Sequence, residues 1–114
     1  MANKEILLQT TSTWNKKEFK ELQLKKPEVT VLNINIGIGE KLSVHKHDLI
    51  NIAYVKKGTL TVTTDNNRQV IVHEGECLSE LIGEYHYGKN DGDEPVELVV
   101  FYIGEKGTPL SVDK

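Results

Sequence analysis

One stretch of the chain, residues 39–58, reads GEKLSVHKHDLINIAYVKKG and places His45 and His47 two positions apart. Side chains alternate between the two faces of a β-strand, so residues at positions i and i+2 point to the same side. A strand over 42–47 therefore presents two imidazoles on one face. Imidazole is a common ligand of divalent transition metals, so this pair predicts part of a metal site.

A second stretch, residues 75–90, reads GECLSELIGEYHYGKN and supplies a third histidine, His86. A histidine that arrives on a distant strand can close a third side around an ion. We therefore predict that His45, His47 and His86 bind iron, manganese, nickel, zinc or copper, which the ligand set does not distinguish. His73 ends an expected strand beside a turn, and we expect it at the surface.

Turn-forming residues interrupt the chain roughly every eight to twelve residues, which is typical of an all-β sandwich or barrel. Apolar periodicity between these turns predicts strands over 29–38, 42–47, 49–56, 59–64, 69–73, 77–82 and 96–103. Only 14–24 has a helical pattern, and it is weak. The length of 114 residues fits one domain. We expect an N-terminal segment, 1–28, to pack on a barrel formed by 29–114.

Composition excludes several classes of function. The net charge of −3 argues against nucleic-acid binding, because phosphate recognition needs a basic surface. The lysines of 16–26 alternate with glutamates and predict a solvated face. No apolar run is long enough to span a membrane, and the start of the chain has no signal-peptide pattern. The single cysteine, Cys77, cannot form an internal disulfide, so we expect a reducing, cytoplasmic location.

Both stretches resemble the two motifs of the cupin superfamily. The first matches in its glycines and histidines, and the second matches in its glycines, His86 and Asn90. The resemblance implies a small single-domain cupin, which is a double-stranded β-helix or jelly-roll barrel. Two positions depart from the motifs: Asn51 replaces a glutamate, and Leu81 replaces a proline. The lost glutamate implies either a three-histidine centre with open positions or a vestigial site that holds no metal.

Other residues are weaker candidates for the site. Glu84, and equally Glu80, is a candidate to turn inward and replace the missing carboxylate. Asn51 offers a neutral oxygen, and Tyr54 is a candidate to line a substrate pocket. Asp48 has the opposite strand parity from the histidines, so we expect it to point outward.

Function stays open between two classes at this point. One is a metal-dependent oxygenase, lyase or isomerase that acts on a small anionic molecule, because three neutral histidines leave the ion its full charge. The other is a small-molecule-binding or sensor module with a vestigial metal site. No general acid or base is evident, so the sequence does not establish an enzyme. The strand 96–103 is apolar on both faces, which predicts burial against a second copy in a homodimer.

Overall fold

The structure, a computed structural model, describes residues 1–114 and contains nine strands and no helix. No element could therefore cross a membrane as a helix. The strands in chain order are β1 (Pro27–Ile36), β2 (His45–Lys46), β3 (Ile50–Lys57), β4 (Leu60–Thr64), β5 (Gln69–Val72), β6 (Cys77–Ser79), β7 (His86–Lys89), β8 (Val96–Glu105) and β9 (Val112–Asp113).

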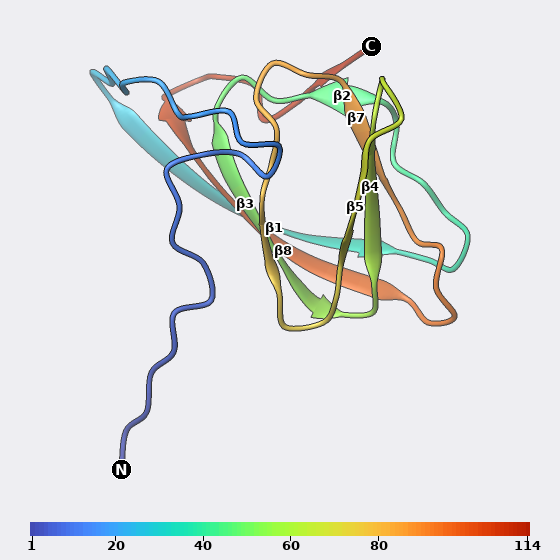
Figure 1. Cartoon of the computed structure of the whole chain (residues 1–114). Coiled ribbons are helices and arrows are strands. Elements are labelled where there is room, and N and C mark those ends of the chain that lie inside the picture. The colour runs from blue at the N-terminus through green and yellow to red at the C-terminus, as the bar shows by residue number, and fades with distance from the viewer.

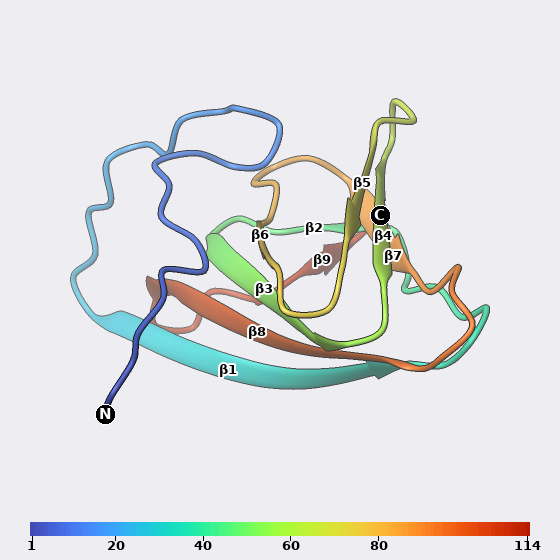
Figure 2. The same cartoon turned by 60° about the horizontal axis from the view of Figure 1, so that its bottom comes forward.

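The strands form two antiparallel sheets that face each other across the core. One sheet has the order β1-β8-β3-β6 and the other has the order β5-β4-β7-β2-β9 (Figures 1 and 2). Consecutive strands thus alternate between the sheets in several places, as in a jelly roll. The predicted all-β barrel is confirmed.

The core lies on the inward parity of the first sheet. On β8, Val96, Leu98, Val100 and Tyr102 are all at most 4% exposed. They pack with inward residues of β3 and β4 in one cluster of 12 buried hydrophobic residues. Each buried aliphatic side chain of this kind contributes roughly 1.5–3 kcal/mol. This core fixes the inner surface from which the candidate site is built.

Two strands were not predicted. The first is β7 (His86–Lys89). It was missed because the residues after His86 are polar and glycine-rich and indicate a loop, although a strand needs only its inward positions to pack. Gly88 takes one of these positions, and a Cβ there would lie 3.2 Å from a methyl carbon of Leu60. The two-residue β9 is too short to leave a periodic signal. The weak helical pattern over 14–24 is wrong, since no helix forms there.

Part of the N-terminal segment covers the free edge of β6. The Trp14 N–H donates to the Ser79 carbonyl (2.9 Å), and the Ser79 hydroxyl donates to the Ser12 carbonyl (2.8 Å). Trp14 also packs against the hydrophobic core. Residues 1–11 remain exposed throughout. The middle of the segment therefore protects a sheet edge from pairing with other strands.

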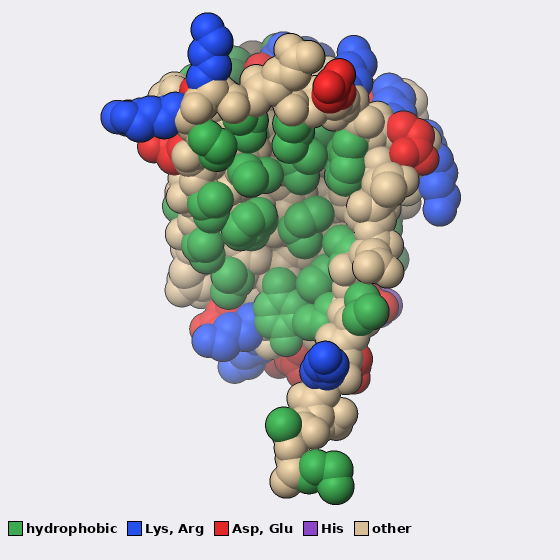
Figure 3. All heavy atoms as spheres, turned by 90° about the vertical axis from the view of Figure 1, so that its left-hand side faces the viewer, with side chains coloured by type: hydrophobic (Ala, Val, Ile, Leu, Met, Phe, Trp, Pro, Cys, Tyr) green, Lys and Arg blue, Asp and Glu red, His purple; other side chains and the backbone are tan.

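The outer face of the first sheet is apolar and uncovered over much of its area. Val29 is 54% exposed, Val31 is 59% exposed and Phe101 is 40% exposed. Val31 and Phe101 are direct partners in the β1–β8 register, so these side chains are adjacent. Figure 3 shows hydrophobic side chains gathered on one broad face of the molecule, with the charged groups at its margins. The first sheet therefore carries an apolar face that no other part of this chain covers at Val29, Val31 and Phe101.

Candidate metal centre

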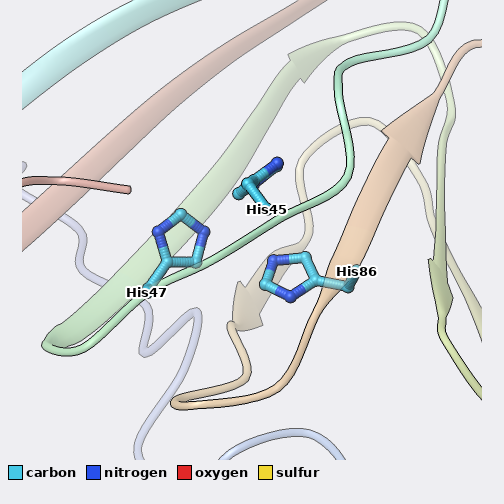
Figure 4. Close-up of side chains that lie close together, drawn as sticks. All are labelled: His45, His47 and His86. Atoms are coloured by element: carbon cyan, nitrogen blue, oxygen red, sulfur yellow. The ribbon is translucent and has the colours of Figure 1, made fainter. Parts of the chain in front are cut away.

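The three histidines of the two motifs converge between the sheets. His45 begins β2, His47 follows it in the connection to β3, and His86 begins β7. The β2–β7 register places His45 opposite His86, and His47 shares the face of His45. The candidate ligand atoms of all three lie within 4.8 Å of one another. Figure 4 shows the three rings turned toward a common space.

Each histidine ring is oriented by a hydrogen bond from its Nδ1 atom to a backbone carbonyl. The acceptors are the carbonyls of Ser43 (2.6 Å), Leu110 (2.8 Å) and Glu84 (2.8 Å), for His45, His47 and His86 respectively. A carbonyl can only accept, so each Nδ1 carries the proton. In the neutral rings every Nε2 then has a free lone pair. Metal-binding histidines in proteins are oriented in this same way.

Two of the three free nitrogens have no hydrogen-bond partner. Nε2 of His47 and Nε2 of His86 are buried and accept no hydrogen bond. His47 is 3% exposed and His86 is 1% exposed. Unsatisfied buried polar atoms cost roughly 1–3 kcal/mol each, and several lone pairs facing one another add repulsion. A cation bound between these nitrogens removes both costs, so the residues fit a metal ion.

Glu80 is the one carboxylate that reaches this cluster. Its Oε2 atom lies 3.5 Å from Nε2 of His86 and 3.6 Å from Nε2 of His47. Its other oxygen, Oε1, is buried without a partner. Burial by itself would raise the pKa of this carboxyl, but the imidazoles of His47 and His86, when protonated in the metal-free protein, outweigh burial and lower its pKa to about 2. Glu80 therefore carries its negative charge at neutral pH.

The charge of Glu80 also shapes the titration of the histidines. Burial lowers the pKa of His45, and although the hydrogen bond to the Ser43 carbonyl acts in the opposite direction, the net pKa is lowered. Burial acts on His86 in the same direction, but the Glu80 carboxylate outweighs it and raises the pKa of His86. Within the cluster, His45 is therefore harder to protonate than a free histidine, and His86 is easier to protonate.

The histidines and Glu80 line a cavity of about 40 Å³ inside the barrel. Its remaining walls are mainly apolar and include Leu98 and Val100 of β8. Tyr102, also on β8, lines the cavity too, and its hydroxyl can donate a hydrogen bond. Burial and the nearby Glu80 charge raise the pKa of Tyr102 to about 12, so its hydroxyl stays protonated. No lysine or arginine lines the cavity.

Two candidates from the sequence lie elsewhere. The Glu84 carboxylate pairs with Lys17 and accepts a hydrogen bond from the Asn15 amide (2.8 Å), because it follows the turn at the barrel surface. Tyr54 is opposite Cys77 in the β3–β6 register, on the outward parity of the first sheet. Neither side chain lines the histidine cavity.

The remaining candidates are placed as follows. Asn51 has the inward parity and is 1% exposed, with its Oδ1 unpartnered, but it does not line the cavity. Asp48 and His73 are exposed at the surface. Sequence reasoning missed Tyr102, because the strand over 96–103 is apolar at both parities and its inward face could not be chosen. In the structure Tyr102 shares strand parity with the buried Leu98 and Val100.

The chain belongs to the cupin family, since the cupin domain model matches residues 33–102. A comparison with curated proteins finds no match. Solved structures with the same fold include an oxalate oxidase in complex with the substrate analogue glycolate, at 24% identity and a TM-score of 0.57 over 65% of this chain and 41% of that chain.

Two further structures show how varied proteins with this fold are. The polyketide cyclase RemF from Streptomyces resistomycificus matches at 19% identity, with a TM-score of 0.62 over 75% of this chain and 59% of that chain. The DMSP lyase DddQ from Ruegeria pomeroyi DSS-3 matches at 16% identity, with a TM-score of 0.65 over 75% of this chain and 43% of that chain. The chain spans less than two thirds of all three structures, and such identities show the fold alone.

Proposed function

We propose that this cupin is a metal-dependent enzyme that acts on a small anionic molecule bound at the histidine cluster. One observation carries the proposal: His45, His47 and His86 are each locked by an Nδ1 hydrogen bond, with their Nε2 atoms turned to a shared space. A purely structural cluster would pair these nitrogens with donors, as buried polar groups are normally paired.

The residues around the cavity have separable roles. The three histidines would hold a divalent ion, which supplies Lewis-acid polarisation and open coordination positions when it is bound. Tyr102 lies in the same lining, and its protonated hydroxyl can donate a hydrogen bond to a negatively charged oxygen of the substrate. The aliphatic walls exclude water, so electrostatic interactions in the cavity are stronger than in bulk solvent.

The size and charge of the cavity favour a small anion. A space of about 40 Å³ admits a few non-hydrogen atoms beside an ion. A divalent ion and the Glu80 carboxylate together leave about one positive charge, rather than the full charge expected from three histidines alone. No basic side chain adds to it. A singly charged carboxylate, thiolate or enolate would neutralise the remaining charge, whereas a dianion would not be matched.

Metal analysis followed by ligand calorimetry tests this function. Protein purified without chelator should contain about one transition-metal ion per chain, and the loaded protein should bind small monocarboxylates or thiols. His86→Ala should lose the metal and the ligand binding, while His73→Ala, at an exposed turn, should keep both. A metal-loaded protein that binds neutral sugars but no anion would overturn the proposal and favour a non-catalytic binding module.

We also propose that the partner of this chain is a second copy of itself. The support is the apolar outer face of the first sheet, where Val31 and Phe101 are adjacent and exposed. The strand that lines the cavity from one side, β8, presents this face from its other side. In a symmetric dimer the outward side chains of β8 would be buried against the second copy, as its inward side chains are buried in the core.

Sedimentation measures the assembly directly. The wild-type protein should sediment as a dimer at micromolar concentration, and Phe101→Asp should give a monomer of the chain mass, 12.9 kDa. Ile71→Asp is a matched control, because Ile71 is also exposed (55%) but lies on the opposite sheet. A wild-type monomer would contradict the homodimer.

A further inference from the structure

The first cupin motif of this chain has Asn51 in place of its glutamate, but the structure contains a carboxylate, that of Glu80, beside this position. The β3–β6 register pairs Ile52 with Ser79 and Ala53 with Leu78. One step further along this register, Asn51 lies opposite Glu80. A hydrogen bond from the Glu80 N–H to the Asn51 carbonyl (3.1 Å) confirms that the two residues are neighbours.

The Glu80 carboxylate has the position of a ligand. Two donor atoms bound to one first-row ion at about 2.1 Å lie roughly 3–3.5 Å apart. Oε2 of Glu80 lies 3.5 Å and 3.6 Å from the Nε2 atoms of His86 and His47. The first of these separations is at the upper end of that range and the second lies about 0.1 Å above it, and the Nε2 lone pairs already face the same space.

The environment of Glu80 favours the same role. The side chain is only 13% exposed, and its Oε1 atom has no hydrogen-bond partner. A buried carboxylate needs a compensating positive charge, and apart from the histidines themselves the cavity lining contains no basic side chain. A bound metal ion compensates the carboxylate and the histidine lone pairs at the same time.

We propose that Glu80 is the fourth protein ligand of the metal centre and replaces, from the neighbouring strand, the glutamate missing at Asn51. This inference rests on the proposed metal site at His45, His47 and His86. The centre would then be a three-histidine, one-carboxylate site in which the carboxylate comes from the second motif. Open coordination positions remain for the substrate.

Cobalt(II) binding tests the proposal, because the visible absorption of Co²⁺ reports its ligands without any activity assay. Calorimetry and absorption spectra are recorded for the wild type, for Glu80→Gln and for Glu84→Gln. The first variant is nearly isosteric and replaces the carboxylate by a neutral amide. The second is a matched control, since its carboxylate pairs with Lys17 at the surface instead of facing the cavity.

We expect Glu80→Gln to weaken Co²⁺ binding at least about 100-fold, more than the roughly 10–100-fold typical of an outer-shell partner, and to alter the spectrum. Glu84→Gln should match the wild type in both. The double variant Asn51→Glu with Glu80→Gln should recover affinity, because it returns the carboxylate to the usual motif position.

Each failure has a separate meaning. An unchanged affinity and spectrum in Glu80→Gln would overturn the ligand role of Glu80 while leaving the histidine site intact. A wild-type protein that binds neither Co²⁺ nor Zn²⁺ would overturn the metal centre itself, and this proposal with it. Should Glu80→Gln not fold, Glu80→Asp retains the charge with a shorter reach, and an unchanged Co²⁺ spectrum in that variant would equally exclude coordination.

Discussion

The two motif regions contribute to the site in different ways. The first, residues 39–58, brings two histidines but ends its ligand pattern with the neutral Asn51. The second, residues 75–90, brings one histidine together with the carboxylate of Glu80, at a position that the motif does not assign to a ligand. The difference indicates that a metal site depends on where its ligand atoms and charges lie in space, and not on which motif position supplies them. Neighbouring strands of one sheet can exchange the residues that supply them.

The largest effect should come from the single histidine of the second motif. His86→Ala removes one of the three convergent Nε2 atoms and the side chain that is closest to Glu80. We expect Zn²⁺ affinity to fall at least about a thousandfold, or roughly 4 kcal/mol. Competition titration against a chelator of known affinity measures the change, with a thermal melt of the metal-free protein as the check on folding. Retention of Zn²⁺ within tenfold of wild type would place the metal elsewhere.

The next largest effect should be the difference in unfolding free energy lost on replacing the asparagine of each motif. Asn90 is fully buried and binds three backbone groups: its amide donates to the carbonyls of Ile36 (3.1 Å) and Glu94 (2.8 Å), and its carbonyl accepts from the Gly92 N–H (2.9 Å). Asn51 makes one such bond, and its Oδ1 is already unpartnered. Asn90→Ala should therefore cost about 3 kcal/mol of unfolding free energy and Asn51→Ala about 1 kcal/mol. Urea denaturation of both variants compares them, and equal losses would contradict this difference.

Two of the motif glycines provide a smaller contrast. Gly58 and Gly75 both have positive φ angles, +83° and +84°, which an L side chain adopts at a cost of roughly 1–2 kcal/mol. A Cβ on Gly58 would also lie 2.6 Å from the Pro95 carbonyl oxygen, whereas a Cβ on Gly75 meets nothing within 4 Å. Gly75→Ala should lose only the conformational term, and Gly58→Ala should lose about 2 kcal/mol more. Guanidine denaturation midpoints separate the two, and a larger loss for Gly75→Ala would be inconsistent with the backbone contact.

Spacing in the sequence was enough to predict the fold and the histidine cluster. Period-two alternation fixes which residues of β1 point inward, because parity is a local property of the strand. The sequences of β3 and β8 are apolar at both parities, so alternation alone does not show which of their residues point inward. The bounds of β7 could not be predicted in the same way. Gly88 occupies an inward position of β7, where the absence of a side chain leaves room for Leu60. This fit depends on β4, which is distant in the sequence.

The choice between Glu80 and Glu84 shows the same limit. Both have the same parity, and both precede His86 by an even number of residues. The sequence cannot separate them, since the outcome depends on the pairing of β6 with β3 and on where the N-terminal segment lies. Pairing places Glu80 opposite Asn51, while Asn15 and Lys17 hold Glu84 at the surface. These are long-range contacts that alternation does not encode.

The smallest effect should come from this outer carboxylate. Glu84→Gln removes its ion pair with Lys17, in which the two side chains are 31% and 61% exposed, and weakens the bond from the Asn15 amide. Solvent screens such pairs, so we expect a loss of less than about 1 kcal/mol in unfolding free energy. The Glu84 backbone carbonyl, which accepts from His86 Nδ1, is unchanged by the substitution. Denaturation at low and high salt checks the assignment: the small loss should shrink as salt rises, because an exposed ion pair is screened. A salt-independent loss of several kcal/mol would mean that Glu84 belongs to the buried cluster, and the contrast between the inner and outer carboxylates of the second motif would not hold.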